Sequence, residues 1–362
     1  MAGLYIHIPF CKSRCIYCGF YSTVGLGLRQ KYIDAVCQEM MLRGRLEVDT
    51  IYLGGGTPSQ LTGEQLQQLF LYINKVYGNH AQEVTIECNP DDITDSFAAT
   101  LAQLPITRIS MGTQTLDDQR LRFLHRRHTA EQVPQAVQRL RNAGIRNISI
   151  DLMYGFPGET LNDWEHDIEQ ALSLDVEHLS AYCLMVEEGT PLYRMDIETV
   201  DEETERQMYE MLMNKLKAAG YEHYEISNFA RPGYRSRHNS NYWREVPYIG
   251  LGAAAHSYDL KSRQWNVSDI HQYMEAIEQG EVPCERELLD DDTRYNDRIT
   301  VALRTCEGLD LETLPDKHRR YCLHEAQRFL DGGLLQLTNG HLVLTRQGLF
   351  VSDLIMSGLI CV

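Results

Sequence analysis

The chain has 362 residues, and its 34 Lys and Arg against 51 Asp and Glu give a net charge of −17 at neutral pH. Hydrophobic residues make up 43% of the chain, too many for a disordered protein, and no run of roughly 18 apolar residues predicts a membrane span. The negative charge disfavours nucleic acid and anionic membrane surfaces as partners. We therefore expect a soluble globular protein with one large domain and one small one.

The beginning of the chain lacks the charged and long apolar segments of a signal peptide, so we expect a cytoplasmic protein. In a reducing compartment, cysteines are metal ligands, reactive thiols or buried hydrophobic residues rather than disulfides. Seven of the ten cysteines stand singly, and we expect them to be packing residues. These seven are Cys37, Cys88, Cys183, Cys284, Cys306, Cys322 and Cys361.

Short runs rich in β-branched and aromatic residues alternate with longer segments of helical periodicity. The predicted strands are 4–8, 50–53, 84–88, 108–111, 147–153, 178–184 and 221–226. The predicted helices are 30–43, 63–76, 96–103, 130–142, 161–172 and 202–219. This alternation predicts an α/β fold with a parallel sheet or barrel, whose ligands bind at the carboxyl ends of the strands.

Three cysteines, Cys11, Cys15 and Cys18, follow the first predicted strand in the pattern CxxxCxxC. A zinc site would need a fourth Cys or His nearby, and none follows at a suitable spacing. Three thiolates on a four-iron cluster leave one iron free for an outside ligand. The spacing therefore favours a [4Fe-4S] cluster, with a zinc-binding adaptor as an alternative.

The CxxxCxxC pattern resembles the signature of radical S-adenosylmethionine (SAM) enzymes. This resemblance implies that the amino and carboxylate groups of SAM chelate the free iron. It also implies that an electron from the cluster cleaves SAM to a 5′-deoxyadenosyl radical.

Polar or glycine-rich motifs follow several predicted strands. The glycines at 54–56 allow the backbone to approach a ligand closely. Glu87, Gln114 and Asp151 offer acceptors for a ribose diol or an ammonium group, and Arg126 offers a fork for a carboxylate. Their recurrence at successive strand ends indicates one shared site.

Nearly the whole chain resembles the radical SAM branch that contains the oxygen-independent coproporphyrinogen III dehydrogenases. The resemblance implies a partial (β/α)6 TIM-like barrel with a small helical, winged-helix-like C-terminal domain. It assigns SAM contacts to Tyr5, Gly55, Gly56, Thr57, Glu87, Gln114, Arg126 and Asp151, with Tyr17 and Met185 beside the adenine.

Two features depart from the dehydrogenase pattern. Those enzymes resemble CxxxCxxCxC, whereas Phe20 occupies the position of the additional cysteine here. Only four residues precede Tyr5, so we expect no N-terminal extension of the kind that encloses the porphyrinogen.

Residues 231–244 form a basic and aromatic stretch in this acidic chain. Imidazole can ligate haem iron, aromatic rings can stack on the macrocycle, and arginines can pair with propionates. The chemistry alone favours a loop whose aromatic residues pack under the barrel and whose arginines balance nearby carboxylates. However, His238, Asn239, Tyr242 and Trp243 resemble the HNxxYW haem motif of HemW-type haem chaperones, which implies haem binding there. His256 is a candidate second ligand, or else a structural or SAM-side residue.

From about residue 290 the alternation of strands and helices ends. The sequence predicts helices at 294–304 and 317–330, a hairpin at 334–345 and a last helix from 347. Eight Lys and Arg against eleven Asp and Glu over 290–362 give a net charge of −3. This favours a lid or a partner-docking surface over DNA binding. We predict three parts: a radical SAM core at 1–230, a haem-motif segment and linker at 231–290, and a C-terminal domain at 291–362.

These features, with the resemblance, predict a chaperone that carries a cluster and SAM, binds haem and delivers it to haem-requiring proteins such as respiratory enzymes. An electron donor for the cluster is an expected partner, and nucleic acid is not. The alternative is a coproporphyrinogen III dehydrogenase that forms protoporphyrinogen by oxidative decarboxylation. Whether SAM is cleaved, whether haem is attached covalently, and whether the protein is a homodimer stay open.

Overall fold

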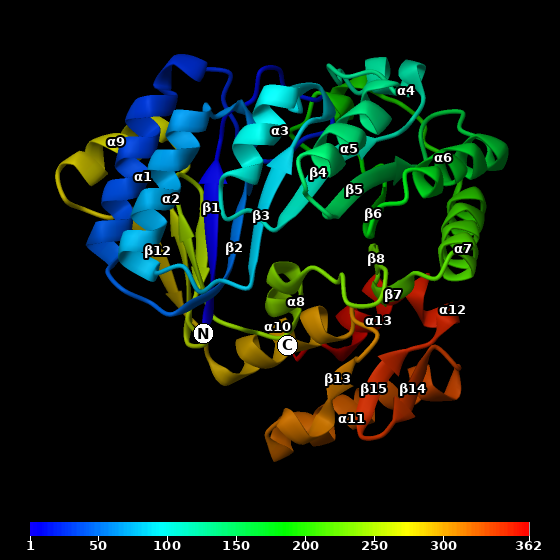
Figure 1. Ribbon diagram of the computed structural model, residues 1–362. Helices are drawn as coiled ribbons and strands as arrows, with labels where there is room; N and C mark the ends of the chain where they lie inside the picture. Colours follow the sequence, from blue (N-terminus) through cyan, green and yellow to red (C-terminus); the bar gives the residue numbers. More distant parts are fainter. Residues whose placement is uncertain (362) are drawn as a thin grey trace.

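The computed structural model describes residues 1–361 and contains a twelve-stranded sheet covered by helices, with a smaller domain below it in Figure 1. Six parallel strands in chain order form the centre of the sheet, which confirms the predicted α/β partial barrel. They are β1 (Ala2–Ile8), β2 (Val48–Gly55), β3 (Glu83–Cys88), β4 (Arg108–Gln114), β5 (Asn147–Tyr154) and β6 (His178–Cys183).

Helices connect these strands and cover the outer face of the sheet (Figure 1). They are α1 (Arg29–Arg43), α2 (Gly63–Tyr77), α3 (Asp95–Ala102), α4 (Asp118–Phe123), α5 (Gln132–Asn142), α6 (Leu161–Ser173) and α7 (Glu202–Ala218). Helix α2 begins where the sequence predicts it because Thr62 and Gln65 form a capping box. All six predicted helices are confirmed, and the short α4 was not predicted.

Further strands, most of them antiparallel, extend both edges of the parallel sheet. At one edge, β9 (Tyr248–Leu251) runs parallel to β1 and is followed outward by β10 (His256–Tyr258), β11 (Ser262–Asn266) and β12 (Cys284–Leu288). At the other edge, β8 (Asn228–Ala230) pairs with β6 and with β7 (Glu222–Glu225). The strand predicted at 221–226 therefore exists, but as the antiparallel β7 rather than as a seventh parallel strand.

Residues 231–290, which the sequence analysis treats as a motif segment and linker, are built into the barrel. They form α8 (Arg237–Trp243), β9 to β12 and α9 (Ile270–Glu278). Helix α9 buries Ile270, Tyr273 and Ile277 in the main core, because these residues recur at helical spacing on one face. Strand β9 joins this segment to the parallel sheet by pairing directly with β1.

The C-terminal domain has its own hydrophobic core. It contains α10 (Asp291–Ala302), α11 (Asp316–Asp331), β13 (Leu309–Asp310), β14 (Leu335–Thr338), β15 (His341–Leu344), α12 (Arg346–Leu349) and α13 (Ser352–Leu359). The predicted helices and hairpin are confirmed, and the last predicted helix is divided into α12 and α13. Residue 362 of the predicted domain lies outside the described residues.

The prediction that the single cysteines are packing residues is correct in part. Cys37, Cys88 and Cys322 are buried, whereas Cys284 and Cys306 are exposed, so the prediction is wrong for these two. Within residues 1–361, every helix is too short or too polar to cross a lipid bilayer.

Candidate functional site

The three clustered cysteines lie on the cluster loop, which we define as residues 9–24 after β1. Two backbone hydrogen bonds between its ends, from Cys11 to Thr23 and from Thr23 to Pro9, close the loop. Ile16 donates its N–H to the carbonyl of Leu124 at 3.3 Å, which attaches the middle of the loop to the segment after α4. The loop is thus held at the carboxyl end of the parallel strands.

The side chains of the cluster loop fit a group with several metal atoms. Cys11, Cys15 and Cys18 are half-buried free thiols, and burial raises the pKa of Cys11 and Cys18. Within residues 1–361, no three His, Cys, Asp or Glu side chains are arranged to hold one metal ion. Three thiols on one short loop suit a cluster of the [4Fe-4S] type, because such a cluster is held by cysteine thiolates and three of them leave one iron free for an outside ligand.

The glycine-rich loop after β2 packs against the cluster loop. Gly55 has a φ of 109°, and a Cβ there would lie 2.4 Å from the ring of His7. A Cβ on Gly56 would lie 2.8 Å from the carbonyl oxygen of Ile8, which accepts the N–H of Gly56 at 2.9 Å. The structure shows that these glycines make room for the protein's own β1 and cluster loop, and their expected contact with a ligand stays a prediction.

Replacing Gly56 with alanine is expected to move the cluster loop, because the new Cβ would meet backbone atoms rather than a flexible side chain. Overpacking of this kind costs about 1–3 kcal/mol of folding stability. We expect lower thermal stability and less iron bound after anaerobic reconstitution. Gly27→Ala is the matched control, since a Cβ there would meet nothing within 4 Å. Equal iron content and melting temperature in the two variants would contradict this account.

Two acidic residues, one near the end of β3 and one within β5, lie inside the barrel. Glu87 accepts hydrogen bonds from the hydroxyl of Tyr52 at 2.8 Å and from the N–H of Gly55 at 3.1 Å. Desolvation and, to a smaller extent, the nearby charge of Asp151 raise the pKa of Glu87 to about 7. Desolvation also raises the pKa of Asp151 to about 6. Near neutral pH, the pair can therefore hold a proton as well as accept hydrogen bonds.

The raised pKa of Glu87 predicts a pH-dependent stability. Its folded pKa lies above the ordinary value of 4.5, so its favourable contribution is complete below about pH 4 and is lost as the pH rises through 7. Glu87→Gln removes this titration. From pH 4.5 to pH 8 we expect the wild type to lose on the order of 3 kcal/mol relative to this variant, measured by urea unfolding at each pH. Glu64→Gln, at an exposed position of α2, is the control. The prediction fails if Glu87→Gln leaves the pH slope unchanged.

Arg126 joins the cluster loop to the ends of two strands. Its guanidinium donates to Cys15 Sγ at 3.5 Å and to Asn89 Oδ1 at 2.7 Å, and it also bonds to the carbonyl of Gly112. Its buried Nε has no hydrogen-bond partner in the described part of the chain. Gln114, at the end of β4, has a φ of 68°, a conformation that few non-glycine residues adopt outside functional or strained positions.

Of the remaining predicted SAM residues, Thr57 lies beside the cluster loop, whereas Tyr5 lies in the middle of β1. Thr57 Oγ1 is 3.5 Å from Cys11 Sγ, and Tyr5 shares a hydrogen bond of 3.0 Å with His7 Nδ1. Tyr17 packs against the apolar residues below the cluster loop, whereas Met185 is 64% exposed. The sequence analysis did not identify His7, Tyr52 and Asn89. Their positions within or just after β1, β2 and β3 were the available signal.

The residues of the predicted haem motif lie at the opposite end of the barrel. They belong to α8, which sequence chemistry alone treated as a loop, and the Ser236 side chain caps this helix. His238 is 1% exposed. Its Nδ1 lies 2.9 Å from Thr50 Oγ1, and its Nε2 lies 2.8 Å from the hydroxyl of Tyr242. Both ring nitrogens of His238 are therefore occupied inside the protein.

Helix α8 is also attached to the amino end of β3. The Glu83 carboxylate accepts the backbone N–H groups of Arg237 at 3.0 Å and of His238 at 2.9 Å. The ring of His238 stacks on Tyr52, with 5.2 Å between ring centres. Because the hydroxyl of Tyr52 bonds to Glu87, one side chain spans from the motif to the predicted SAM residues.

Most arginines of the stretch 231–244 are engaged within the protein, as the structural alternative predicts. Arg231, Arg235 and Arg237 make ion pairs or hydrogen bonds with side chains, whereas Arg244 makes none within residues 1–361. The partners are Asp175 for Arg231, Glu222 and Glu307 for Arg235, and Gln82 for Arg237. His256 is exposed on β10, its ring 6.2 Å from that of Trp265, and shares no hydrogen bond or ring contact with α8 among the described residues.

The cysteines of the cluster loop and the motif residues of α8 are separated by the length of β1. A Cβ on Gly3 would lie 3.2 Å from His238, while Ile8 contacts the glycine-rich loop beside the cysteines. Five residues of extended strand span about 17 Å. The cysteines and α8 therefore lie at opposite ends of the barrel, and the C-terminal domain lies on the side of α8 (Figure 1).

Two family models match the chain. The model of the radical SAM superfamily covers residues 5–171, and that of the HemN C-terminal domain covers residues 289–351. The superimposable solved structures include coproporphyrinogen III oxidase (HemN) from Escherichia coli, with a TM-score of 0.86 and 21% identity over 99% of this chain and 89% of that one. At this identity, the match shows a shared fold.

Several relatives have a higher sequence identity to this chain than that solved structure has. The heme chaperone HemW of Bacillus subtilis is 36% identical over 332 residues, which is 88% of this chain and 88% of the relative. The protein of the same name from Mycobacterium tuberculosis is 34% identical over 373 residues, covering 99% of this chain and 94% of the relative. The heme chaperone HemW of Escherichia coli is 35% identical over 262 residues, which is 70% of this chain and 69% of the relative.

Proposed function

The chain belongs to the HemW family of radical SAM proteins, and from this premise we propose that it binds haem and delivers it to haem-requiring proteins. The observation that carries the proposal is the 34% identity to a heme chaperone over 99% of this chain. A match of this length includes the barrel, α8 and the C-terminal domain together. The relatives' name thus applies to the whole arrangement rather than to the radical SAM core alone.

Cys11, Cys15 and Cys18 would hold a [4Fe-4S] cluster. With SAM bound to its free iron, such a cluster supplies one-electron chemistry. Arg126 orients Cys15 through its hydrogen bond, and Thr57 contacts Cys11. The remaining proposed SAM residues are Tyr5, Gly55, Gly56, Glu87, Gln114 and Asp151.

Glu87 and Asp151 would contribute to SAM binding through their charge. Both carboxyl groups have raised pKa values, so their ionisation is incomplete near neutral pH. A cationic ammonium group beside them favours the charged form and lowers both pKa values again. SAM binding is therefore expected to release protons from this end of the barrel.

We place the haem at α8, whose motif residues are His238, Asn239, Tyr242 and Trp243. The distance of about 17 Å along β1 between the two ends of the barrel supports a carrier, because a porphyrin held at α8 lies away from the cysteines that would hold the cluster. The C-terminal domain, beside α8, is the proposed surface for a haem acceptor, and the cluster loop is the proposed surface for an electron donor. The division at residues 230 and 290 remains a prediction.

Haem titration tests the proposal. The full-length chain is purified anaerobically, its cluster is reconstituted, and haemin is added while the Soret band is followed. We expect one haem per chain and transfer of this haem to apomyoglobin, which serves as a generic acceptor. Failure to bind a stoichiometric amount of haem would refute the chaperone function.

The alternatives give different results in the same preparation. A coproporphyrinogen III dehydrogenase would form protoporphyrinogen from coproporphyrinogen, SAM and a reductant, a result opposed by Phe20 in place of the additional cysteine. A zinc-binding adaptor would be colourless and contain zinc. We expect neither outcome.

A further inference from the structure

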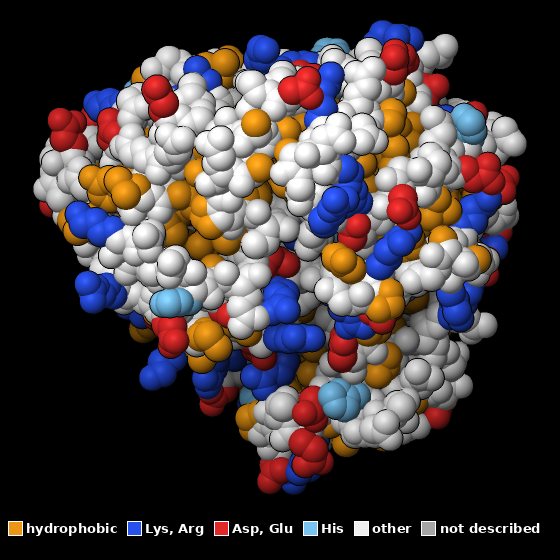
Figure 2. All heavy atoms as spheres, in the orientation of Figure 1, with side chains coloured by type: hydrophobic (Ala, Val, Ile, Leu, Met, Phe, Trp, Pro, Cys, Tyr) orange, Lys and Arg blue, Asp and Glu red, His pale blue; other side chains and the backbone are white. Residues whose placement is uncertain are grey.

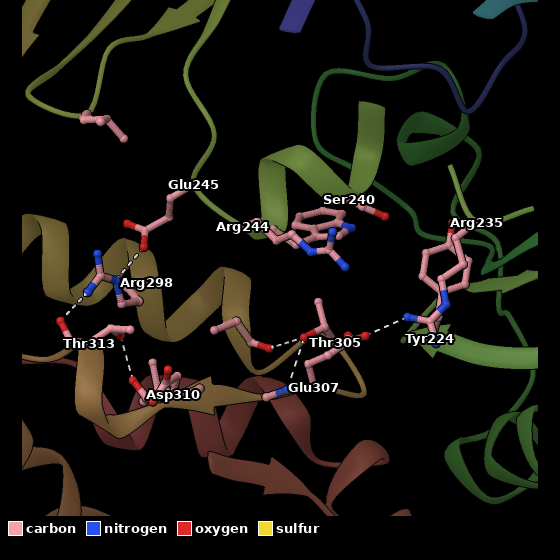
Figure 3. A pocket seen from close by; sticks show the side chains of 15 residues that line it. Tyr224, Arg235, Ser240, Arg244, Glu245, Arg298, Thr305, Glu307, Asp310 and Thr313 are labelled. Carbon is pink, nitrogen blue, oxygen red and sulfur yellow. Dashed lines mark hydrogen bonds and ion pairs between the residues drawn. The ribbon is translucent and has the colours of Figure 1, made fainter. Parts of the chain in front are cut away.

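The charged side chains at the α8 end of the barrel form simple pairs. Beside the cavity of about 480 Å³ between α8 and the C-terminal domain (Figure 3), Arg298 Nε donates to Glu245 at 2.5 Å and Arg235 Nη1 donates to Glu307 at 2.6 Å. On the face drawn in Figure 2, Lys and Arg side chains lie mixed with Asp and Glu at the surface. Water screens exposed pairs of this kind, so each of them holds its elements together weakly.

Arg120 of α4 belongs to a more deeply buried group of charges at the cysteine end of the barrel. Its guanidinium lies 3.0 Å from Asp167 Oδ2, 3.2 Å from Glu159 Oε1 and 3.7 Å from Asp163 Oδ1. The side chains of Glu159 and Asp167 are 0% and 2% exposed. Burial raises the pKa of both carboxyl groups, and the charge of Arg120 opposes this effect. Because removing one partner from a buried ion pair is strongly unfavourable, these contacts fix the position of α4.

The two buried carboxylates also hold the turns that follow β4 and β5. Asp167 accepts the hydroxyl of Thr115, the residue after β4, at 2.6 Å. Glu159 accepts the N–H groups of Gly155 at 2.7 Å and of Phe156 at 3.0 Å, directly after β5. Arg120 therefore joins α4 to the turns at the carboxyl ends of two neighbouring strands.

The end of α4 determines where the following residues lie. His125 has a φ of 58° and ends the helix in a Schellman motif. In this motif, the N–H of His125 donates to the carbonyl of Arg122 at 3.1 Å, and the N–H of Arg126 donates to the carbonyl of Leu121 at 2.9 Å. Because both bonds return to α4, the backbone of Arg126 keeps a fixed place relative to this helix.

Two contacts connect this turn with the cluster loop. The side chain of Arg126 donates to Cys15 Sγ at 3.5 Å, and the carbonyl of Leu124 accepts the N–H of Ile16 at 3.3 Å. Leu124 and Ile16 also belong to one buried apolar cluster with Phe156. A short helix and two hydrogen bonds thus lead from Arg120 to the cysteines.

We infer that Arg120 is a positioning residue for the cluster loop. By holding α4 to the turns after β4 and β5, it places the Leu124 carbonyl and the Arg126 guanidinium against that loop. Arg120 acts through α4, since it makes no hydrogen bond to the cluster loop within residues 1–361. The inference rests on the proposed function, which assigns a cluster to this loop, and adds a residue that determines where the loop lies.

The first test uses the full-length chain without a cluster, so its result is independent of the proposed function. Hydrogen exchange of single amides is followed by NMR in the wild type and in Arg120→Gln. We expect the N–H of Ile16 to exchange at least tenfold faster in the variant, because its acceptor on Leu124 is no longer held. The N–H of Cys11 donates to Thr23 within the same loop at 2.9 Å and should exchange at an unchanged rate. General destabilisation would accelerate both amides equally.

Arg141→Gln is the matched control. Arg141 is 17% exposed, like Arg120 at 16%, and it pairs with both oxygens of Glu177 at 2.9 Å, just before β6 begins. Its replacement should lower the melting temperature by a similar amount but leave the exchange of Ile16 unchanged. Equal exchange of Ile16 in the two variants, or equal acceleration of Ile16 and Cys11 in Arg120→Gln, overturns the inference. Should Arg120→Gln fail to fold, the same comparison of Ile16 with Cys11 in Arg120→Lys decides the question.

Iron binding is the second measurement. After anaerobic reconstitution, we expect Arg120→Gln to hold less than half of the iron of the wild type, because Cys15 and its loop are displaced. Arg141→Gln should hold as much iron as the wild type, and equal iron contents in the two variants would also overturn the inference. Failure of the wild type itself to bind iron is a separate outcome, which refutes the proposed cluster and leaves the exchange result at Ile16 to decide the role of Arg120.

Discussion

Cys15→Ala is expected to remove the iron–sulfur chromophore from the reconstituted protein. Three thiolates are the only protein ligands proposed for the cluster, so loss of one leaves two irons of the four without a protein ligand. Cys15 also accepts the hydrogen bond of Arg126, which joins the cluster loop to the ends of β3 and β4. We expect iron and sulfide contents close to zero and no absorbance near 400 nm, which is about where such clusters absorb.

The matched control for this variant is Cys306→Ala. Cys306 is an exposed free thiol in the C-terminal domain, far along the chain from the cluster loop. Its replacement should leave the iron content unchanged. Retention of a full cluster in Cys15→Ala, or equal loss in Cys306→Ala, would contradict the proposed ligand set.

Glu39→Ala is expected to cost about 3–5 kcal/mol of folding stability, the range for removal of one partner from a buried ion pair. The carboxylate of Glu39 is fully buried and pairs with Arg43 at 2.8 Å. It also accepts hydrogen bonds from Gly252 N–H, Asn266 Nδ2 and Tyr273 OH at 2.7–2.8 Å. One side chain of α1 thus connects the segment after β9, the strand β11 and the helix α9.

Urea unfolding followed by circular dichroism measures this effect. The control is Glu47→Ala, which removes an exposed carboxylate before β2 and should change the free energy of unfolding by less than about 0.5 kcal/mol. A similar, small change in both variants would show that Glu39 does not hold this edge of the sheet to α1.

The sequence predicted the parallel half of the fold well because its signals are local. Buried strands and amphipathic helices repeat with clear periods, and residues such as Thr62 and Gln65 mark a helix start. The hairpin of the C-terminal domain was equally recognisable from Asn339 and Gly340.

The edge strands were missed because their pairing depends on distant partners. Strands β8 and β10 have only three residues each, too few to show a period of two. Strand β9 joins β1 from about 245 residues away in the chain, a contact that no local pattern encodes. Residues 231–290, which contain β9 to β12, were therefore treated as a motif segment and linker.

The same limit applies to the candidate sites. Cys11, Cys15 and Cys18 were identified because thiols at close spacing are rare, and the residues at strand ends were identified because parallel strands share one edge. The glycines at 55 and 56 were identified as ligand contacts, and the sequence did not show that their neighbours within the protein are His7 and Ile8. Spacing shows which residues are unusual, but not what lies beside them.

The sequence alone determined the family and the parallel core and supplied the proposed thiol donor set, because these depend on residue types and local order. Only the tertiary structure decided that α8 lies at the opposite end of the barrel from the cysteines, with His238 enclosed and Arg244 free. The physical reason is that burial and charge pairing depend on which segments meet in space. His238 meets Thr50, and Arg235 meets Glu222 and Glu307, across large separations in the chain.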